Sequence, residues 1–331
     1  MSKVVKYIFT DGFNDLEEYF FKEVELDNDV VLVSKNTCFK NKIIQKLFRL
    51  HFSFKLNSYL SLPFKKLWFP LLDKNKNKSN KCIYLFMVSW YYPSFYKYLR
   101  KRHPAAKIVL YFGDTIISKR RNIRNLNIEK AKKNTDIVYS YNPGDVRKYG
   151  LNYLPMCYSR DPHLMTFKEE NWDVLFIGAA RNRFKEIVES YNHCKRNGLK
   201  VFYYVVGKNI TDLNSPDFII SDHPISMKEY LKYVIKSRCI WEIIDSETEG
   251  NTLRLWDAIM YNKYLITNNR YVKQSKFYDT GYIRYYETID EVNFDFLHLK
   301  SDIAYNYTGE NSPRNFIERI SADLSLDGSN I

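Results

Sequence analysis

The sequence predicts an α/β protein made of two tandem parallel sheets, each covered by helices on both faces. Short continuous apolar runs alternate with helical patterns along most of the chain, which is typical of strands buried between helix layers. The 331 residues suffice for two domains of roughly 150 residues each. A polar stretch at 159–171 separates the two halves. Ligands of such sheets bind beyond the carboxyl ends of the strands, so the residues after each strand are the candidates for function.

The first half, 1–158, is expected to form one domain of alternating strands and helices. Helices are expected at 92–102 and 123–133, and the Lys/Asn/Ser tract at 73–81 is expected to be an exposed loop. The expected strands span 4–9, 30–33, 82–88, 107–112, 137–141 and 152–156.

The second half, 172–311, is expected to follow a linker at 159–171 and to form a second domain of the same kind. Pro313, with Ser312 as its N-cap, is expected to begin a helix in the terminal segment 312–331. The other helices are expected at 183–197, 227–237 and 252–261, and the strands at 173–177, 201–206, 218–221, 239–244 and 264–267.

Composition excludes several classes of protein. The 51 Lys and Arg residues outnumber the 38 acids, a net charge of +13, which favours anionic partners such as nucleotide phosphates, an anionic membrane or nucleic acid. The five scattered cysteines contain no CxxC, which argues against a zinc site or a disulfide framework and favours a reducing compartment. The start MSKVVKYIFTDG is not a signal peptide, and no apolar run approaches the ~18 residues needed to span a bilayer. We therefore expect a cytoplasmic protein, soluble or peripherally attached to a membrane.

The most informative stretch is EGNTLRLWDAIMYNKYLITN at 249–268. Glu249 comes just before an expected helix start, and Asp257 lies eight residues later, about two turns inside the helix. Two acids spaced in this way suit two different hydroxyl-bearing parts of one elongated ligand. The backbone N–H groups at the helix start and the positive end of the helix dipole suit a phosphate between them; these residues are Asn251, Thr252 and Leu253.

This segment resembles the E-x7-E region of GT-B glycosyltransferases of the group 1 superfamily, of the bacterial surface-polysaccharide and lipopolysaccharide type. The resemblance implies an α/β fold of two Rossmann-like domains facing a central cleft, with the donor held by the C-terminal domain. It also implies that Glu249 contacts the donor sugar and that Asp257 binds the ribose of the nucleotide. The chain departs from the family pattern in having Asp at the second position and no Gly in the turn at 261–263.

A second candidate segment is FIGAARNR at 176–183. An expected strand ends at Gly178, and Arg181 and Arg183 stand at the entry to a helix. The guanidinium group suits phosphate because it gives paired, charge-assisted hydrogen bonds, and cations at a helix N-terminus invite an anion. The corresponding strand of the superfamily similarly ends near the donor phosphates. We therefore expect Gly178, Arg181 and Arg183 to hold the diphosphate, together with Lys208, which follows the next strand.

The polar loop at 221–226 precedes another expected helix. In similar enzymes this loop borders the nucleobase, which implies that Ile225 packs on the face of the base and that His223 contacts it. A structural explanation is also available, since Ser226 as N-cap with Glu229 three residues later is a capping pattern.

The N-terminal half is expected to hold the acceptor and any general base. Asp114 follows the strand KIVLYF, and Asp11 follows the first strand. An inverting transferase needs a base that takes the proton of the acceptor hydroxyl, and these two carboxylates are the candidates, Asp114 before Asp11. Both are also explained as turn or cap residues, and a retaining enzyme need not use a protein base.

The positive charge is concentrated in the segment 36–72, since no acid occurs between Val30 and Leu72. One helical face there carries apolar side chains and another carries basic ones, which is typical of a membrane-surface helix. The alternative is a helix packed on its own domain with solvated lysines. The apolar face comprises Ile43, Leu47, Leu50 and Phe54, and the basic one Lys42, Lys46 and Arg49.

The sequence thus predicts a glycosyltransferase that moves a sugar from a nucleotide-diphosphate sugar to a glycan or lipid-linked acceptor at the inner, cytoplasmic face of the membrane. No metal or other cofactor is expected, because arginine, lysine and helix N-termini neutralise the leaving diphosphate. One alternative is a basic nucleic-acid-binding protein, favoured by 28 Tyr and 22 Phe; no known motif for it is present, so no nucleic-acid partner is expected. The other is an epimerase or dehydrogenase, which the absence of GxGxxG after Phe9 disfavours. The sugar, the acceptor and the stereochemical course stay open.

Overall fold

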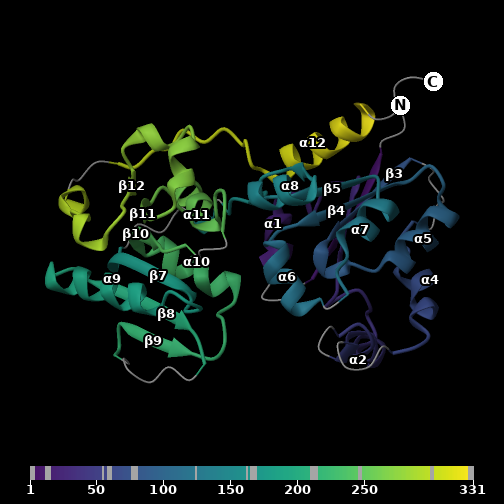
Figure 1. The fold of residues 1–331 in the computed structure, drawn as a ribbon, viewed down its shortest axis with the longest axis horizontal. Coiled ribbons are helices and arrows are strands. Elements are labelled where there is room, and N and C mark those ends of the chain that lie inside the picture. The colour runs from purple at the N-terminus through teal and green to yellow at the C-terminus, as the bar shows by residue number, and fades with distance from the viewer. Residues whose placement is uncertain are drawn as a thin grey trace. The chain divides into compact units, whose positions relative to one another are not determined.

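The computed structural model describes residues 4–11, 16–53, 56–57, 62–75, 81–123, 125–161, 163–164, 170–208, 215–244, 248–298 and 302–326. The chain forms two compact units, one of residues 1–159 with 311–331 and the other of residues 160–310. Each unit is built on a six-stranded sheet (Figure 1). The expected architecture of two parallel sheets is confirmed.

The first sheet has the strand order β2-β1-β3-β4-β5-β6, and every pairing is parallel. Its strands are continuous apolar runs; β3 and β4, for example, are buried over nearly their whole length, which is possible only where helices cover both faces. The strands are β1 (Val5–Thr10), β2 (Val30–Ser34), β3 (Cys82–Met87), β4 (Lys107–Phe112), β5 (Ile137–Ser140) and β6 (Asn152–Tyr153).

The helices expected in the first unit are present, and one of them begins later than expected. The helix expected at 123–133 is α7, which begins at Ile128; α6, which ends at Asn122, is a separate helix that was not expected. The Asn127 side chain accepts a hydrogen bond of 2.8 Å from the backbone N–H of Lys130, so it caps α7 and separates it from α6. The α-helices are α1 (Leu16–Phe20), α2 (Lys42–His51), α4 (Phe69–Leu72), α5 (Pro93–Arg102), α6 (Ile116–Asn122), α7 (Ile128–Asn134) and α8 (Pro143–Tyr149), and the 3-10 helices are η2 (Lys22–Val24), η3 (Lys65–Trp68) and η4 (Val88–Trp90).

The C-terminal helix α12 (Pro313–Leu326) belongs to the first unit (Figure 1, yellow). The ring of Phe316 lies 5.0 Å from that of Tyr111 and 6.0 Å from that of Phe21. The Tyr139 hydroxyl donates to a carboxylate oxygen of Asp323 at 2.6 Å. Residues from both ends of the chain therefore complete one core.

The second sheet has the order β12-β11-β10-β7-β8-β9, again with only parallel pairings. The strands β7, β8 and β9 follow one another outward in the sheet. After β9 the chain crosses back to β10, on the other side of β7, so the direction of winding reverses between β7 and β10. The strands are β7 (Trp172–Ala179), β8 (Val201–Val206), β9 (Phe218–Ser221), β10 (Ser237–Glu242), β11 (Tyr264–Thr267) and β12 (Ile283–Tyr285).

Helices cover both faces of the second sheet. On β8, Phe202 stacks on Tyr233 of α10 with ring centroids 4.4 Å apart. The next residue, Tyr203, packs edge-on against Tyr191 of α9 at 5.4 Å. Consecutive strand residues point to opposite faces, so α9 and α10 lie on opposite sides. The helices are α9 (Phe184–Arg196), α10 (Met227–Ile235) and α11 (Leu253–Tyr261), and the 3-10 helices are η6 (Arg270–Gln274), η7 (Tyr278–Thr280), η8 (Ile289–Glu291) and η9 (Asp295–His298).

Candidate functional site

The winding reversal between β7 and β10 marks a candidate binding crevice in the second unit. In open parallel sheets the loops after two such strands diverge and leave a crevice beyond their carboxyl ends. Here those loops are 180–183, after β7, and 243–252, after β10. They contain five of the residues that we predicted to bind a donor, namely Arg181, Arg183, Glu249, Asn251 and Thr252.

Arg183 links the ends of the two strands. Its Nε and Nη2 donate to the carbonyl oxygen of Ala179 at 3.1 and 3.0 Å, and its Nη1 donates to the carbonyl oxygen of Ile243. A Cβ atom on Gly178 would lie 3.5 Å from Nη2 of Arg183, an ordinary contact, and 3.3 Å from Cζ of Phe176, a tighter one. Arg183 is thus placed at the crevice and is also part of its framework.

Arg181 has an unusual backbone for its residue type. Its φ angle is +43°, in the left-handed region, which costs a residue other than Gly, Asn or Asp about 1 kcal/mol or more. The side chain is exposed. Backbone outliers of this kind gather at functional sites, so Arg181 stays a strong candidate for phosphate binding, whereas Lys208 is simply exposed after β8.

Glu249 is held in place just before α11. The hydroxyl of Tyr271 donates to its Oε2 at 3.0 Å. The adjoining Gly250 has a φ of +84°, which glycine adopts without strain, and its carbonyl oxygen accepts from Nδ2 of Asn269 at 3.0 Å. The predicted sugar-binding carboxylate therefore sits on a turn that is fixed from both sides.

Asn251 carries an unsatisfied atom at the same place. Its Oδ1 is buried and has no hydrogen-bond partner among the described residues. An unsatisfied buried acceptor costs about 1–3 kcal/mol, so the site is suited to a ligand or water that donates to this oxygen. Asn251 thereby gains support as a binding residue.

Glu242, which the sequence analysis did not single out, anchors the start of α11. Thr252 is the N-cap of α11: its Oγ1 accepts from the backbone N–H of Arg254 at 3.1 Å and donates to Oε1 of Glu242. Oε2 of Glu242 accepts from the Thr267 hydroxyl at 2.5 Å. Burial raises the pKa of Glu242, and the two threonine hydroxyls and nearby arginines oppose that rise. In the sequence, Glu242 could have been noticed as a single acidic residue at the end of the apolar run CIWE.

Asp257 is fully buried, at 0% exposure. Its Oδ2 accepts from the hydroxyl of Tyr230 and lies 3.2 Å from Nη1 of Arg254. Nη2 of Arg254 donates to the carbonyl oxygen of Ile177, on β7, at 2.5 Å. Burial alone would lower the pKa of Arg254, but Tyr230, Asp257 and Glu242 raise it above its ordinary value. Asp257 thus holds Arg254 against the end of β7, and its contact with a ribose stays a prediction.

The loop at 221–226 has the structure of a cap. The Ser226 side chain accepts from the backbone N–H of Glu229 at 3.2 Å, so the expected N-cap of α10 is present. His223 is exposed, and its carbonyl oxygen accepts from the Tyr204 hydroxyl at 2.9 Å. Ile225 is half-buried. Contacts of His223 and Ile225 with a nucleobase stay predictions.

The two predicted bases of the first unit both lie at strand ends. Asp114, after β4, accepts from the backbone N–H of Thr115 at 2.8 Å and from the Ser118 hydroxyl at 2.9 Å, so it stabilises the start of α6. Asp11, after β1, lies 3.6 Å from Nζ of Lys35. The catalytic role of each stays a prediction, and the contacts of Asp114 fit the cap explanation.

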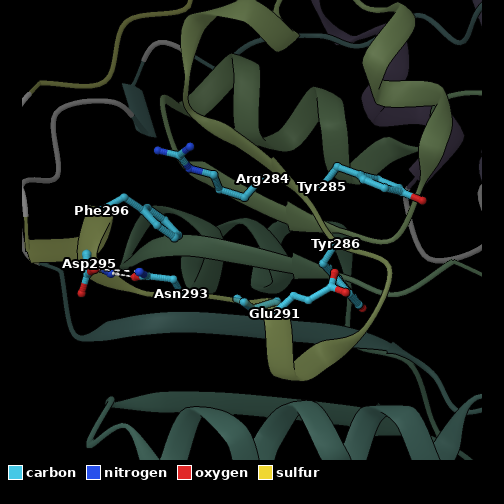
Figure 2. A pocket seen from close by; sticks show the side chains of 8 residues that line it. Arg284, Tyr285, Tyr286, Glu291, Asn293, Asp295 and Phe296 are labelled. Atoms are coloured by element: carbon cyan, nitrogen blue, oxygen red, sulfur yellow. Dashed lines mark hydrogen bonds between the residues drawn. The ribbon is translucent and has the colours of Figure 1, made fainter.

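A cavity of about 290 Å³ lies elsewhere on the second unit (Figure 2). It is next to β12, and two of its polar residues are already paired, since Nδ2 of Asn293 donates to Oδ2 of Asp295 at 2.7 Å. None of the predicted donor-binding residues lines it. Its lining residues are Arg284, Tyr285, Tyr286, Glu291, Val292, Asn293, Asp295 and Phe296.

The described residues contain neither a metal-binding cluster nor a membrane-spanning helix. No group of three or more His, Cys, Asp or Glu side chains there is arranged to hold a metal ion. No helix there has the length and apolar character needed to cross a lipid bilayer.

Comparison with known proteins gives matches in structure only. No protein-family model matches the chain, and no curated protein matches its sequence. An α-glucosyltransferase in complex with UDP-glucose and DNA containing an abasic site is 15% identical over 98% of this chain and 99% of its own, with a TM-score of 0.56. The α-glucosyltransferase in complex with UDP and a 13-mer DNA containing a HMU base is 14% identical over 97% and 99%, also with a TM-score of 0.56. Trehalose-6-phosphate synthase OtsA is 9% identical over 97% and 99%, with a TM-score of 0.57. The expected GT-B fold of two Rossmann-like domains is confirmed.

Proposed function

We propose that the protein is a glycosyltransferase whose donor, a nucleotide-diphosphate sugar, binds at the carboxyl edge of the second sheet. The observation that carries this proposal is that the adjoining loops after β7 and β10 hold Arg181, Glu249 and the unsatisfied Asn251 Oδ1. The likeness to solved structures of the GT-B fold over nearly the whole chain supports it.

The roles of the residues follow from their chemistry. Transfer breaks the bond between the anomeric carbon and the diphosphate, which leaves as nucleoside diphosphate with the bonding electrons. The acceptor oxygen forms the new bond and loses its proton. The N-terminus of α11 and the cation of Arg181 stabilise the charge that develops on the leaving diphosphate. Glu249 accepts hydrogen bonds from the sugar hydroxyls and orients the anomeric carbon.

The Arg181→Asn variant tests the donor site. Asn tolerates a left-handed backbone, so we expect the unfolding midpoint to stay within about 2 °C of the wild-type value. The loss of a charge-assisted contact with phosphate is expected to weaken nucleotide-sugar binding about 10-fold or more. Calorimetric titration with UDP-, GDP-, CMP- and ADP-linked sugars measures both the preferred donor and the loss.

Lys185→Gln is the matched control, since Lys185 is an exposed cation on α9 in the same unit. It should leave nucleotide-sugar affinity unchanged. Equal affinity of Arg181→Asn and wild type would remove Arg181 from the donor site, and no binding of any of the four linkages by the wild type would contradict the proposed function.

For the acceptor, we propose a glycan or lipid-linked molecule presented at the cytoplasmic face of an anionic membrane. Ten large apolar side chains are strongly exposed among the described residues, and seven of them lie between residues 43 and 71. On α2, Ile43 is 71% and Leu50 57% exposed, while Phe48 is buried and holds the helix to the core. The seven residues are Ile43, Ile44, Leu47, Leu50, Phe64, Leu67 and Leu71.

The charges around this apolar surface support a membrane as its partner. Lys40, Lys42, Lys46, Arg49 and Lys66 are exposed beside it. An exposed apolar face with basic residues at its border suits the interface of an anionic bilayer, where each basic residue contributes about 1 kcal/mol. Phe54, part of the predicted apolar face, lies outside the described residues.

The Leu47→Glu variant tests the membrane surface. Leu47 is 53% exposed, so its replacement is expected to leave the fold intact. The lost apolar insertion and the added negative charge should weaken binding to anionic phosphatidylglycerol vesicles at least about tenfold. Vesicle co-sedimentation measures this, with Leu26→Glu, a change of another exposed leucine, as the control that keeps wild-type binding.

DNA is the second candidate acceptor. Two of the similar structures are α-glucosyltransferases crystallised with DNA, and a net charge of +13 suits phosphates. If DNA is the acceptor, the exposed leucines between residues 43 and 71 are not expected to contribute to its binding. A protein that binds duplex DNA equally well as wild type and as Leu47→Glu, and that ignores anionic vesicles, would favour DNA over the membrane.

A further inference from the structure

The cavity beside β12 lies at an open edge of the second sheet (Figure 2). β12 ends the strand order on its side, so among the described residues no strand adjoins its outer edge. Residues 291–296, which run from the end of η8 into η9, form the other wall. The volume of about 290 Å³ is close to the lower end of the range of ~300–1,000 Å³ that is typical of small-molecule sites. All of the lining residues belong to the second unit.

The backbone of Tyr285 provides a hydrogen-bond donor and an acceptor at this edge. The carbonyl oxygen of Tyr282 accepts from the N–H of Leu265, on β11, at 3.0 Å. The N–H of Tyr286 donates to the carbonyl oxygen of Thr267, also on β11, at 3.0 Å. In a parallel ladder, alternate residues bond to the strand on one side and the residues between them face the opposite side. The N–H and C=O of Tyr285 therefore face the open edge, and Figure 2 shows its ring directed away from the other lining side chains.

Charged side chains add further polar groups to the cavity. Arg284 is exposed, and its guanidinium lies 5.2 Å from the centre of the Phe296 ring. Asp295 is exposed and accepts from Nδ2 of Asn293 at 2.7 Å, but a carboxylate has about four acceptor positions. The cavity thus combines hydrogen-bond donors and acceptors with two apolar residues, Val292 and Phe296.

The charges of the cavity decide which ligand it suits. Its lining has two carboxylates, of Glu291 and Asp295, against the one guanidinium of Arg284, whereas the whole chain has a net charge of +13. A phosphate or another anion would meet both carboxylates, so Coulomb repulsion disfavours it. A cation stacked on the Phe296 ring is not favoured either, because the guanidinium of Arg284 already lies over that ring. A neutral ligand with many polar groups fits best.

We propose that this cavity binds a neutral sugar ring. Each sugar hydroxyl both donates and accepts hydrogen bonds, so the ring matches the backbone N–H and C=O of Tyr285 together with the side chains of Arg284 and Asp295. Its C–H groups contact Val292 and Phe296. The inference goes beyond the proposed function, because none of the predicted donor-binding residues lines the cavity and the site holds a sugar without transferring it. In a transferase that acts on a glycan, it is a second point of attachment for that glycan.

NMR of protein labelled with nitrogen-15 in its tyrosines tests the site directly. The probes are glucose, galactose, N-acetylglucosamine and maltose, and the signal of Tyr285 is identified by its absence from the Tyr285→Phe variant. At least one of the sugars should move the Tyr285 amide signal with a saturating dependence on concentration and a dissociation constant of about 1–10 mM. Inorganic phosphate at the same concentrations should leave the signal in place. A signal that no sugar moves, or that phosphate moves equally, would overturn the proposal.

A double variant shows whether the side chains of the cavity hold the sugar. Arg284→Ala with Asp295→Ala removes one cation and one acid from exposed positions, so the fold is expected to remain intact. The affinity for the sugar should fall at least about tenfold. Lys185→Ala with Glu189→Ala, which removes an ion pair of 3.7 Å on the outside of α9, is the control with the same change of charge and should keep wild-type affinity. Equal affinity of the two double variants would overturn the proposal.

The result is independent of the donor site because the probes are free sugars. A wild type whose Tyr285 signal responds to sugars but which binds no nucleotide sugar contradicts only the proposed function. A wild type that binds a nucleotide sugar while its Tyr285 signal ignores every free sugar overturns only the cavity site.

Discussion

Replacing Arg254 with methionine is expected to lower the free energy of unfolding of the second unit by about 3–5 kcal/mol, because it breaks a buried ion pair by removing one of its two charges. Asp257 is completely buried, and Nη1 of Arg254 lies 3.2 Å from its Oδ2. The change also removes the bond from Arg254 to the carbonyl oxygen of Ile177. Scanning calorimetry should show the transition of this unit lowered by roughly 6–20 °C.

A double variant provides a check on the cause. Arg254→Met combined with Asp257→Asn removes both charges of the pair and should recover a large part of the stability. A deficit that is the same in the single and the double variant would show that the charge pair is not its cause.

Arg196→Met is the matched control for the arginine change. Arg196 pairs with Asp290 at 3.8 Å on the same unit, but both side chains are largely exposed. Exposed ion pairs contribute about 0–1 kcal/mol, so this variant should melt within about 4 °C of the wild type.

Replacing Glu249 with alanine is expected to reduce kcat/KM for donor turnover about 10- to 150-fold, the equivalent of one lost charge-assisted contact of about 1.5–3 kcal/mol. The carboxylate is half-buried on the turn before α11, and it accepts a hydrogen bond from the Tyr271 hydroxyl. Stability should change little, because the Gly250 turn is held separately by Asn269. Steady-state release of nucleoside diphosphate measures the effect.

Tyr271→Phe tests how much of the effect of Glu249 depends on the orientation of its carboxylate. It removes the hydroxyl that donates to Glu249 but keeps the ring, so we expect a loss several-fold smaller than that of Glu249→Ala. Nucleoside diphosphate alone, without a sugar, should bind Glu249→Ala as well as it binds wild type. A variant with unchanged kcat/KM, or with equal losses for the sugar-linked and sugar-free nucleotides, would contradict the contact with the donor sugar.

The fold could be predicted largely from the sequence because strands that are covered by helices on both faces have uninterrupted apolar sequences. β3 and β4 are clear examples, and both were expected within a residue or so of their ends. β12 was missed because it has three residues, of which one is buried. The start of α7 was expected five residues too early, because Asn127 acts as a cap only when its side chain turns back on the helix that follows.

The site could be predicted in part for a similar reason. Loop residues with a local signal, such as Glu249 before Gly250 or Arg181 at a helix entry, stand out in the sequence. Glu242 and Arg254 do not, because their partners are distant in the sequence: Glu242 binds Thr267, and Arg254 binds Ile177. Only the folded sheet brings these pairs together.

The return of α12 to the first unit has a consequence for synthesis of the chain. The first unit needs Phe316 and its neighbours, which leave the ribosome only after every residue of the second unit has been made. Domains of most proteins fold in order from the N-terminus as they are synthesised. In this protein the second unit, complete at residue 310, has been synthesised whole while the first unit still lacks its last helix, so we expect the core of the first unit to be completed last.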